Sequence, residues 1–410
     1  MNSYVIIGNG IAATGCIEGI RSKDPDGKIT IVSEENHPAY CRPLISYYLE
    51  GKTDTERILY RSPDFYERMN CSVLYGKRAV SLDTEKKMVK LDDGAELPYT
   101  KLCIATGSDP FQPPFEGLDT VDNKFSFMKL DDALSLEAAI NSDSRVLIIG
   151  AGLIGLKCAE GIRDRVKSIT VCDLSQRILS SIFDDECAAF MQKHLENNGI
   201  QFMLGDSAAR FNGKTAFMKS GKTVDFDVLV LTVGVRPNIS LIKDAGGKTN
   251  RGIVCSESMQ TSIPDIYAAG DCTEIFDVAS DQYKVLATLP NASMEGFIAG
   301  ANMAGGNETF DKGTAMNSLG FFGLSAMTAG SYEGDVYEEK TEQSVKKLFI
   351  KDDLLKGFML IGCSERAGIY TSLIRERTPL SSINFELLKK AATTAAFPEE
   401  VRRKKFGGVV

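Results

Sequence analysis

The feature of this chain with the most direct chemical meaning is a glycine-rich segment that occurs twice. The first copy is Gly8-Asn9-Gly10-Ile11-Ala12-Ala13, and the second is Gly150-Ala151-Gly152-Leu153-Ile154-Gly155. In such a segment, the first glycine permits a tight turn and the second lets the backbone approach a pyrophosphate. The pyrophosphate then binds at the N-terminus of the next helix, where unpaired N–H groups and the helix dipole attract it. Each copy therefore predicts a binding site for one dinucleotide.

The elements that must position these segments are also readable in the sequence. Apolar runs at residues 4–7 and 146–149 predict buried strands, and each glycine segment opens a helix-like pattern. One such motif is a weak signal, because glycine-rich turns occur in many α/β sheets. Two copies in the right context predict two bound dinucleotides, and a reason to hold both is electron transfer between them.

An acidic residue is expected where the second strand of each unit ends, because a carboxylate there accepts hydrogen bonds from the adenosine ribose. In the first unit, the strand predicted at residues 28–32 is followed by Glu34 and Glu35. Either side chain meets the requirement, and we favour Glu34.

In the second unit, the strand predicted at residues 168–172 leads directly into Asp173. A free carboxylate at this position favours a ribose 2′-hydroxyl and repels a 2′-phosphate, so the site is predicted to bind NAD and not NADP. Arg177 lies nearby in the sequence and would favour the phosphate instead.

The composition of the chain fits a soluble, cytoplasmic enzyme of two or three domains. Its 410 residues include 47 basic and 55 acidic side chains, and the net charge of −8 argues against a nucleic-acid partner. The longest apolar run, residues 146–156, contains three glycines and is too short to span a bilayer. The first predicted strand begins by Tyr4, which leaves no room for a signal peptide, so no membrane association is expected.

The ten cysteines do not form a recognisable metal or redox motif. None are spaced C-x-x-C or C-x-x-x-x-C, which argues against a redox disulfide, an iron–sulfur cluster or a zinc site, and no metal is expected. We expect most of these cysteines to be buried thiols in a reducing compartment.

Three further segments each predict a strand that ends in a turn of small residues. They are residues 101–108 with Ala105-Thr106-Gly107, residues 228–234 followed by Val235-Arg236-Pro237-Asn238, and residues 261–272 with Ala268-Ala269-Gly270-Asp271. Asp271 is well placed to bind hydroxyl groups of a flavin's ribityl chain. Its alternative role is to cap the N-terminus of a following helix, and the two roles are compatible.

The order of these motifs resembles that of the two-dinucleotide flavoproteins, the pyridine nucleotide–disulfide oxidoreductase family. The segment from Pro38 to Tyr47 is similar to the Y-x-[RK]-P-x-L-S segment of the NADH:rubredoxin oxidoreductase and nitrite reductase branch. The resemblance covers about residues 1–380. It implies an α/β fold with two Rossmann-like dinucleotide-binding domains and a C-terminal α/β interface domain. The implied parts are an FAD domain at residues 1–108 and 231–310, an NAD domain inserted at 109–230 and an interface domain at 311–385. Residues 386–410 then form a basic C-terminal extension beyond these domains.

Carried over position by position, the resemblance implies two sets of cofactor-binding residues. FAD is expected to contact Gly8, Asn9, Gly10, Ile11, Ala13, Glu34, Glu35, Arg42, Ala79, Thr106, Gly107 and Asp271. NAD(H) is expected to contact Gly150, Gly152, Leu153, Ile154, Gly155, Asp173 and Gly234. Within these sets, Ala79 presents its backbone to the FAD adenine, and Gly234 lies beside the nicotinamide half of NAD(H).

The chain departs from parts of the family at positions close to the path of the electrons. Pro43 stands where the peroxidase and oxidase branch has a redox cysteine, and Cys41, two residues earlier, is a poor substitute. Lys157 stands where relatives commonly have a glutamate beside the nicotinamide and the flavin N5 atom. It either stabilises negative charge on the reduced flavin or points to solvent, and Arg42 is a second candidate for offsetting flavin charge. His37, near the flavin segment, is interpreted as a solvated loop residue.

The C-terminal extension, residues 386–410, has a character of its own. It is rich in basic residues and contains three glutamates, and its basic residues are Lys389, Lys390, Arg402, Arg403, Lys404 and Lys405. The extension is either a solvated tail or a docking arm for an acidic partner.

Together these features predict an FAD-dependent NADH oxidoreductase that transfers electrons between NAD(H) and a small iron–sulfur protein of the ferredoxin or rubredoxin type. Flavin suits this task, because it accepts two electrons as a hydride and can release them one at a time. The alternatives are an NADH oxidase or a peroxide or disulfide reductase, and a redox-sensing flavoprotein. The protein is expected to form a homodimer or to be a subunit of a complex.

Overall fold

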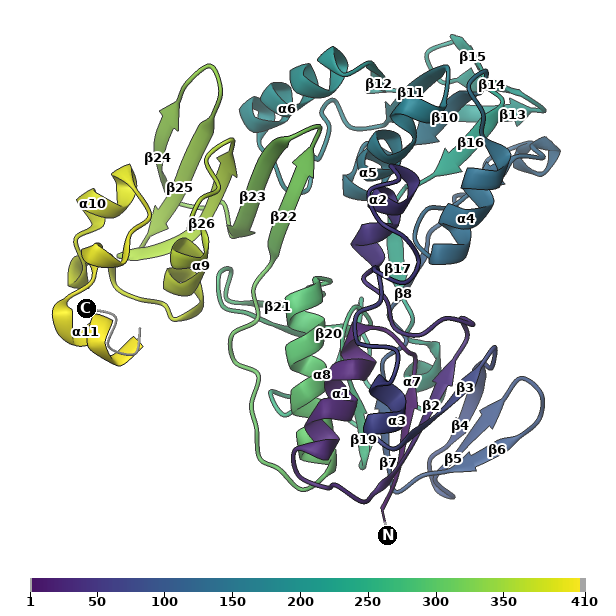
Figure 1. Ribbon diagram of the computed structural model, residues 1–410, viewed down its shortest axis with the longest axis vertical. Coiled ribbons are helices and arrows are strands. Elements are labelled where there is room, and N and C mark those ends of the chain that lie inside the picture. Colours follow the sequence, from purple (N-terminus) through teal and green to yellow (C-terminus); the bar gives the residue numbers. More distant parts are fainter. Residues whose placement is uncertain (1, 406–410) are drawn as a thin grey trace.

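The computed structural model describes residues 2–405 and is built around three five-stranded sheets with helices packed against them (Figure 1). Two of these sheets are parallel throughout, and the third is antiparallel. This arrangement confirms the predicted α/β class with two Rossmann-like sheets and a separate C-terminal part. None of the helices within residues 2–405 combines the length and the apolar character needed to cross a membrane.

The first parallel sheet has the strand order β19-β7-β1-β2-β3. Its strands are β1 (Ser3–Ile7), β2 (Lys28–Ser33), β3 (Cys71–Tyr75), β7 (Lys101–Ile104) and β19 (Ile266–Ala268). The central strands are rich in buried Val and Ile, as expected for a parallel sheet that is covered on both faces. The glycine segment at residues 8–13 joins β1 to helix α1 (Ile11–Arg21) at the carboxyl edge of this sheet.

Helix α1 packs directly against α8 (Leu289–Met303), which comes from the other end of the sequence (Figure 1). A Cβ atom added at Gly296 would lie 2.0 Å from the carbonyl oxygen of Ala12. A Cβ atom added at Gly19 would lie 2.0 Å from the carbonyl oxygen of Phe297. Because no larger residue fits at these points, the two helices meet backbone to backbone, and their relative position is fixed.

The second parallel sheet has the strand order β12-β11-β10-β16-β9. Its elements are β9 (Lys124–Phe125), α4 (Leu130–Ala139), β10 (Arg145–Ile149), α5 (Leu153–Ile162), β11 (Ser168–Asp173), α6 (Asp185–Asn197), β12 (Ile200–Leu204) and β16 (Val228–Leu231). It repeats the construction of the first sheet, since its glycine segment also joins the central strand β10 to a helix, α5. The strands β8 (Ser108–Pro110) and β17 (Val235–Pro237) pair antiparallel and connect the two parts of the chain.

The antiparallel sheet has the strand order β22-β23-β26-β25-β24. Its elements are β22 (Met316–Phe321), β23 (Leu324–Gly330), β24 (Asp335–Lys340), β25 (Val345–Lys351), β26 (Leu354–Ile361), α9 (Gly368–Arg375), α10 (Phe385–Lys390) and α11 (Glu399–Lys405). The strands of each sheet all come from one of the predicted domains, with the exception of Leu231, which ends β16 but falls in the predicted FAD domain. The division into domains itself stays a prediction.

One of the two expectations for the C-terminal extension was a solvated tail, and the structure shows that part of the extension is instead packed against the protein. Leu388 is 0% exposed and Phe397 is 4% exposed, and both belong to the same apolar cluster as Leu373 of α9. This cluster holds α10 and the segment after it against the antiparallel sheet. Residues 406–410, which end the extension, lie outside the described residues.

Shorter elements complete the structure between these sheets. They are α2 (Ile45–Leu49), α3 (Phe65–Arg68), β4 (Ala79–Asp83), β5 (Met88–Leu91), β6 (Glu96–Pro98), β13 (Ala208–Asn212), β14 (Thr215–Met218), β15 (Thr223–Asp225), α7 (Ser240–Asp244), β18 (Ile253–Val254), β20 (Thr273–Asp277) and β21 (Gln282–Lys284).

Candidate cofactor-binding sites

The two glycine segments have the same local geometry. Gly8 has a φ of +107° and Gly150 has a φ of +116°, a region that side chains disfavour. A Cβ atom on Gly8 would lie 2.0 Å from the carbonyl oxygen of Ala105, and one on Gly150 would lie 2.3 Å from that of Thr232. Each segment is therefore a tight turn that passes directly over the end of the neighbouring parallel strand.

The second glycine of each segment leaves space for a ligand. Apart from the glycine and its two chain neighbours, no atom of residues 2–405 lies within 4 Å of the position that a Cβ atom would take at Gly10 or at Gly152. These residues precede α1 and α5, and neither helix has a side-chain N-cap or an acidic residue in its first turn. The first N–H groups of both helices are therefore available to an anion such as a pyrophosphate.

A cleft runs along the carboxyl edge of the first sheet and brings together nearly all of the residues predicted to bind FAD. Those that line it are Gly8, Asn9, Gly10, Ile11, Glu34, Glu35, Arg42, Ala79, Thr106, Gly107 and Asp271. Ala13 does not line the cleft, because it is fully buried in α1. Leu289 and Ala292 of α8 also line the cleft, and nothing in their local sequence marked them as part of a site.

Asp271 lies in the turn between β19 and β20 and faces this cleft. Because β20 begins at Thr273, no helix starts here, and the alternative interpretation of Asp271 as a helix N-cap is wrong. Burial raises the pKa of its carboxyl group, and the positive charge of Arg42 partly offsets that effect. No hydrogen bond to this carboxylate occurs within residues 2–405, so its oxygens are free to accept bonds from a ligand's hydroxyl groups.

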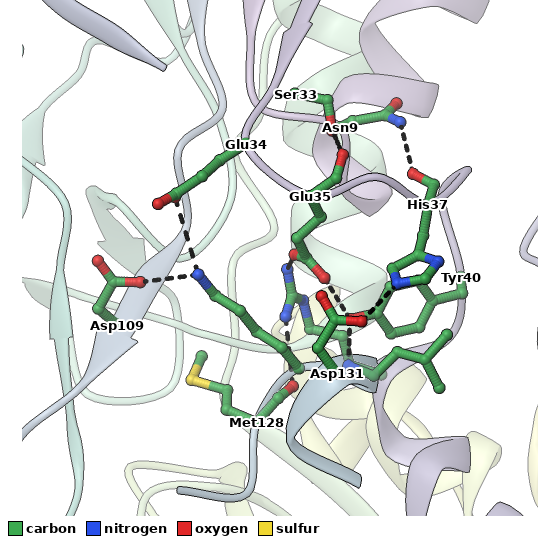
Figure 2. Close-up of polar contacts among 12 residues, drawn as sticks. Asn9, Ser33, Glu34, Glu35, His37, Tyr40, Asp109, Met128 and Asp131 are labelled. Carbon is green, nitrogen blue, oxygen red and sulfur yellow. Dashed lines mark hydrogen bonds and ion pairs between the residues drawn. The ribbon is translucent and has the colours of Figure 1, made fainter. Parts of the chain in front are cut away.

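Glu34 and Glu35, the two candidates for the ribose, have different surroundings (Figure 2). The carboxylate of Glu35 forms an ion pair with Arg42 and accepts a hydrogen bond from the Tyr40 hydroxyl at 2.6 Å. The side chain of Glu34 is 55% exposed, and its nearest cation is Lys129 at 3.7 Å. Glu34 is therefore the carboxylate that remains available for a ribose, which supports the preference for it.

Arg42 is fixed by contacts on two sides. Besides its ion pair with Glu35, its Nη1 donates a hydrogen bond to the carbonyl oxygen of Met128 at 3.2 Å. Burial alone would lower the pKa of Arg42, but Tyr40, Glu35 and Asp271 together raise it. The guanidinium is thus a permanent positive charge at the cleft and is suited to offset a bound cofactor's negative charge.

Residues from the second part of the chain also reach this cleft. Lys129, which precedes α4, lies 3.7 Å from Glu34 and 3.8 Å from Asp109. His37 is not simply a solvated loop residue, because its Nε2 lies 2.7 Å from a carboxylate oxygen of Asp131 in α4 (Figure 2). These contacts depend on packing between segments far apart in the sequence, and no local sequence pattern predicts them.

The second glycine segment is tied to its predicted acidic residue. Asp173 ends β11, and its carboxylate accepts hydrogen bonds from the backbone N–H groups of Ala151 and Ser175, both at 2.7 Å. The guanidinium of Arg177 is directed elsewhere, since its Nη1 contacts Asp185 at 2.7 Å. The residue that would favour a 2′-phosphate is therefore already paired with a carboxylate.

The remaining residues predicted to bind NAD(H) lie around the carboxyl edge of the second sheet. Leu153, Ile154 and Gly155 form the first turn of α5, and Gly234 lies between β16 and β17 with a φ of +107°. None of them lines the cleft described above.

Lys157 occupies the first part of α5 and is largely buried. Its ammonium group pairs with Glu160, donates a hydrogen bond to the carbonyl oxygen of Gly320 at 3.2 Å and lies 4.6 Å from the ring centre of Tyr47. Because its side chain is only 14% exposed, the alternative in which Lys157 points to solvent is wrong.

The cysteines match the expectation of reduced thiols, because all ten are free and seven of them are buried. Cys41, the substitute weighed for a redox cysteine, does not line the cleft. Burial raises the pKa of the Cys41 thiol, so it stays protonated at neutral pH and is a poor nucleophile.

Comparison with known proteins gives the class of protein that this fold and these sites define. Residues 2–296 match the family described as pyridine nucleotide-disulphide oxidoreductase, and the chain belongs to this family. It is thus an NAD(P)H-dependent oxidoreductase of a family whose members bind FAD and NAD(P)H.

Individual relatives are similar over most of their length. The chain is 30% identical to the epsilon subunit of NADH-dependent phenylglyoxylate dehydrogenase of Aromatoleum evansii, and the match covers 93% of each chain. It is 31% identical to rubredoxin-NAD(+) reductase of Alcanivorax borkumensis over 67% of this chain and 73% of that protein. Its fold is shared with the covalent putidaredoxin reductase–putidaredoxin complex, with a TM-score of 0.88, 24% identity and coverage of 96% and 97%.

Proposed function

We propose that this protein is an FAD-dependent NADH oxidoreductase that transfers electrons between NAD(H) and a small iron–sulfur or rubredoxin-type carrier. The observation that carries the proposal is that the two sites have the same construction. Each has a glycine turn, a helix N-terminus without a side-chain cap, and a carboxylate where the second strand of the unit ends or just beyond. One site lies in a cleft that is also lined by the fixed cation Arg42 and the free carboxylate of Asp271, which fits FAD, whose ribityl chain carries hydroxyl groups.

In the first site, the chain's own groups account for each part of FAD. The N-terminus of α1 and Gly10 hold the diphosphate, and Glu34 accepts hydrogen bonds from the adenosine ribose. Asp271 accepts hydrogen bonds from the ribityl hydroxyl groups, and Arg42 offsets negative charge. Bound FAD supplies the step that side chains cannot, which is the exchange of a hydride for single electrons.

In the second site, the chain favours NADH. The N-terminus of α5 and Gly152 hold the pyrophosphate, and Asp173 faces the ribose. Its charge would repel a 2′-phosphate, and Arg177 is held by Asp185. No protein acid or base is needed for hydride transfer, so the task of these residues is to orient the nicotinamide half.

The identity of the electron acceptor is the more specific part of the proposal. Cys41 is outside the cleft and protonated, which supports direct transfer from the cofactor to the acceptor without a thiol step. The relative from Alcanivorax borkumensis is a rubredoxin reductase, and the structurally similar reductase forms a complex with putidaredoxin. These relatives support a carrier of that type as the acceptor.

The test is a kinetic comparison of acceptors on the FAD-loaded protein. NADH-driven reduction of rubredoxin and of a [2Fe–2S] ferredoxin is measured beside oxygen consumption. We expect one of the two carriers to be reduced much faster than oxygen, and Cys41→Ser to leave that rate close to wild type. Faster turnover with oxygen or peroxide than with either carrier would favour an oxidase or peroxidase, and loss of turnover in Cys41→Ser at normal FAD content would revive a thiol step.

A further inference from the structure

A buried carboxyl group lies directly beneath the turn that presents Asp271. It belongs to Glu295 of α8, which is 1% exposed. One of its oxygens, Oε2, accepts a hydrogen bond from the backbone N–H of Gly270 at 2.8 Å and another from the Thr273 hydroxyl at 2.6 Å. Glu295 therefore joins both ends of the turn to the helix, and Asp271 is the residue between these anchors that faces the cleft.

The buried environment of Glu295 makes its ionised form unfavourable. Burial raises the pKa of this carboxyl group to about 7, the hydrogen bonds from Thr273 and Gly270 work against that rise, and the nearby charge of Asp271 adds to it. Within residues 2–405, no cation forms an ion pair with it. The carboxyl group thus keeps a proton or loses it close to neutral pH.

The other titratable groups that face Glu295 are one carboxyl group and three thiols. Asp271 also faces Glu295; burial raises the pKa of its carboxyl group from 3.8, and the charge of Arg42 works against that rise. The remaining groups are three thiols, Cys103, Cys255 and Cys272, and burial raises the pKa of Cys255 and Cys272 far above neutrality. The pKa of Cys103 is also raised well above its usual value, through its contact with Cys16 and through burial.

We propose that Glu295 is a positioning residue that links occupancy of the FAD site to uptake of one proton. This inference rests on the proposed function, because the ligand is FAD. When the cofactor's diphosphate enters the cleft, the added negative charge makes an ionised Glu295 still less favourable. The carboxylate then takes one proton from solvent and becomes a neutral carboxylic acid, and no bond other than this O–H bond forms or breaks. Its Oε2 still accepts the two hydrogen bonds that hold the turn.

The sign of the pH dependence follows from this linkage. Because bound FAD favours the protonated form, FAD binds more tightly at low pH than at high pH. The affinity falls as the pH rises past 7, by roughly tenfold for each unit by which FAD raises the pKa of Glu295.

The experiment is calorimetric titration of the apoprotein with FAD between pH 6 and pH 8.5. Each titration is repeated in phosphate and in Tris, because the difference in binding enthalpy between these buffers gives the number of protons taken up. We expect the wild type to take up a substantial fraction of a proton at pH 7.5. We expect Glu295→Gln, which keeps an oxygen as acceptor for Gly270, to take up much less and to bind with nearly constant affinity.

Two control variants separate Glu295 from its neighbours. Glu274 is a buried carboxyl group of β20, next to Thr273 in the sequence, and its Oε2 atom has no hydrogen-bond partner within residues 2–405. The variant Glu274→Gln should keep the wild-type proton uptake. His37→Gln removes the imidazole that lines the cleft, and this variant should also keep the wild-type proton uptake.

The outcomes are distinct. Proton uptake that persists in Glu295→Gln, or that disappears in His37→Gln instead, overturns the proposal. Wild-type protein that binds FAD without taking up a proton overturns it too, whatever the variants do. Wild-type protein that does not bind FAD at any pH contradicts the proposed function itself.

Discussion

The carboxylate of Asp173 accepts a hydrogen bond from the backbone N–H of Ala151 at 2.7 Å. The acid at the end of β11 is thereby held against the glycine segment that begins α5. The ribose of a bound dinucleotide would contact Asp173, and its pyrophosphate would contact the glycine segment. Because these two groups are hydrogen-bonded to each other, the choice of nucleotide and the position of its phosphates would be coupled.

We therefore expect a strong preference for NADH over NADPH. In the wild type, Asp173 would face the 2′-phosphate of a bound NADPH, and a like-charge contact of this kind costs several kcal/mol. Asp173→Ser should narrow the preference, measured as the ratio of kcat/KM for the two nucleotides. Asp185→Asn, which removes the carboxylate that pairs with Arg177 but keeps Asp173, should narrow it less. Equal use of both nucleotides by the wild type would contradict this assignment.

Asp271 is expected to determine how tightly FAD is retained. Asp271→Ala removes a charged hydrogen-bond acceptor that the structure leaves free, and such bonds contribute about 1.5–3 kcal/mol. FAD affinity, measured by fluorescence titration of the apoprotein, should fall by one to two orders of magnitude. Asp265→Asn is the matched control, because Asp265 pairs with Lys87 and Lys101 and does not line the cleft. A similar loss in both variants would show that only fold stability had changed.

The docking role of the basic extension needs a test that leaves its packing intact. Deleting residues 386–410 would also remove Leu388 and Phe397 from the core, so the charges alone should be changed. The exposed residues Lys390, Arg403 and Lys404 can be replaced together by Gln. If they steer an acidic carrier, the rate with the protein carrier should fall at low salt and depend less on salt. NADH-driven ferricyanide reduction should stay near wild type, and unchanged carrier rates at low salt would argue against docking here.

The raised pKa of Glu295 also predicts how stability depends on pH. Between its ordinary value of 4.5 and the folded value of about 7, the folded apoprotein binds more protons than the unfolded chain. Its stability therefore falls as the pH rises through this range, by at most about 3 kcal/mol. In Glu295→Gln that contribution should vanish, so the Tm of the variant should drop less between pH 5 and pH 8. Parallel Tm profiles for both proteins would place the pKa of Glu295 below this window.

The sequence predicts what depends on neighbouring residues and misses what depends on packing. The glycine turns, their strands and Asp173 follow from local patterns, because a tight turn before a helix needs particular residues at fixed positions. The alternative role of Asp271 as a helix cap is wrong, because a turn before a helix and a turn before β20 look alike in sequence. The environments of Lys157 and Glu295 were not predictable, because each is set by a partner or a surface far along the chain.

The backbone contact between α1 and α8 has a consequence for how the protein is made. Helix α1 ends at Arg21, and the helix against which it packs begins only at Leu289, so the ribosome produces them at widely separated times. The N-terminal strands can form early, but the cleft lacks its α8 wall and the carboxyl group of Glu295 until most of the chain has emerged. If the cleft binds FAD as proposed, cofactor loading is a late event in the biosynthesis of this protein, and a nascent chain that stops short of residue 303 should not retain FAD.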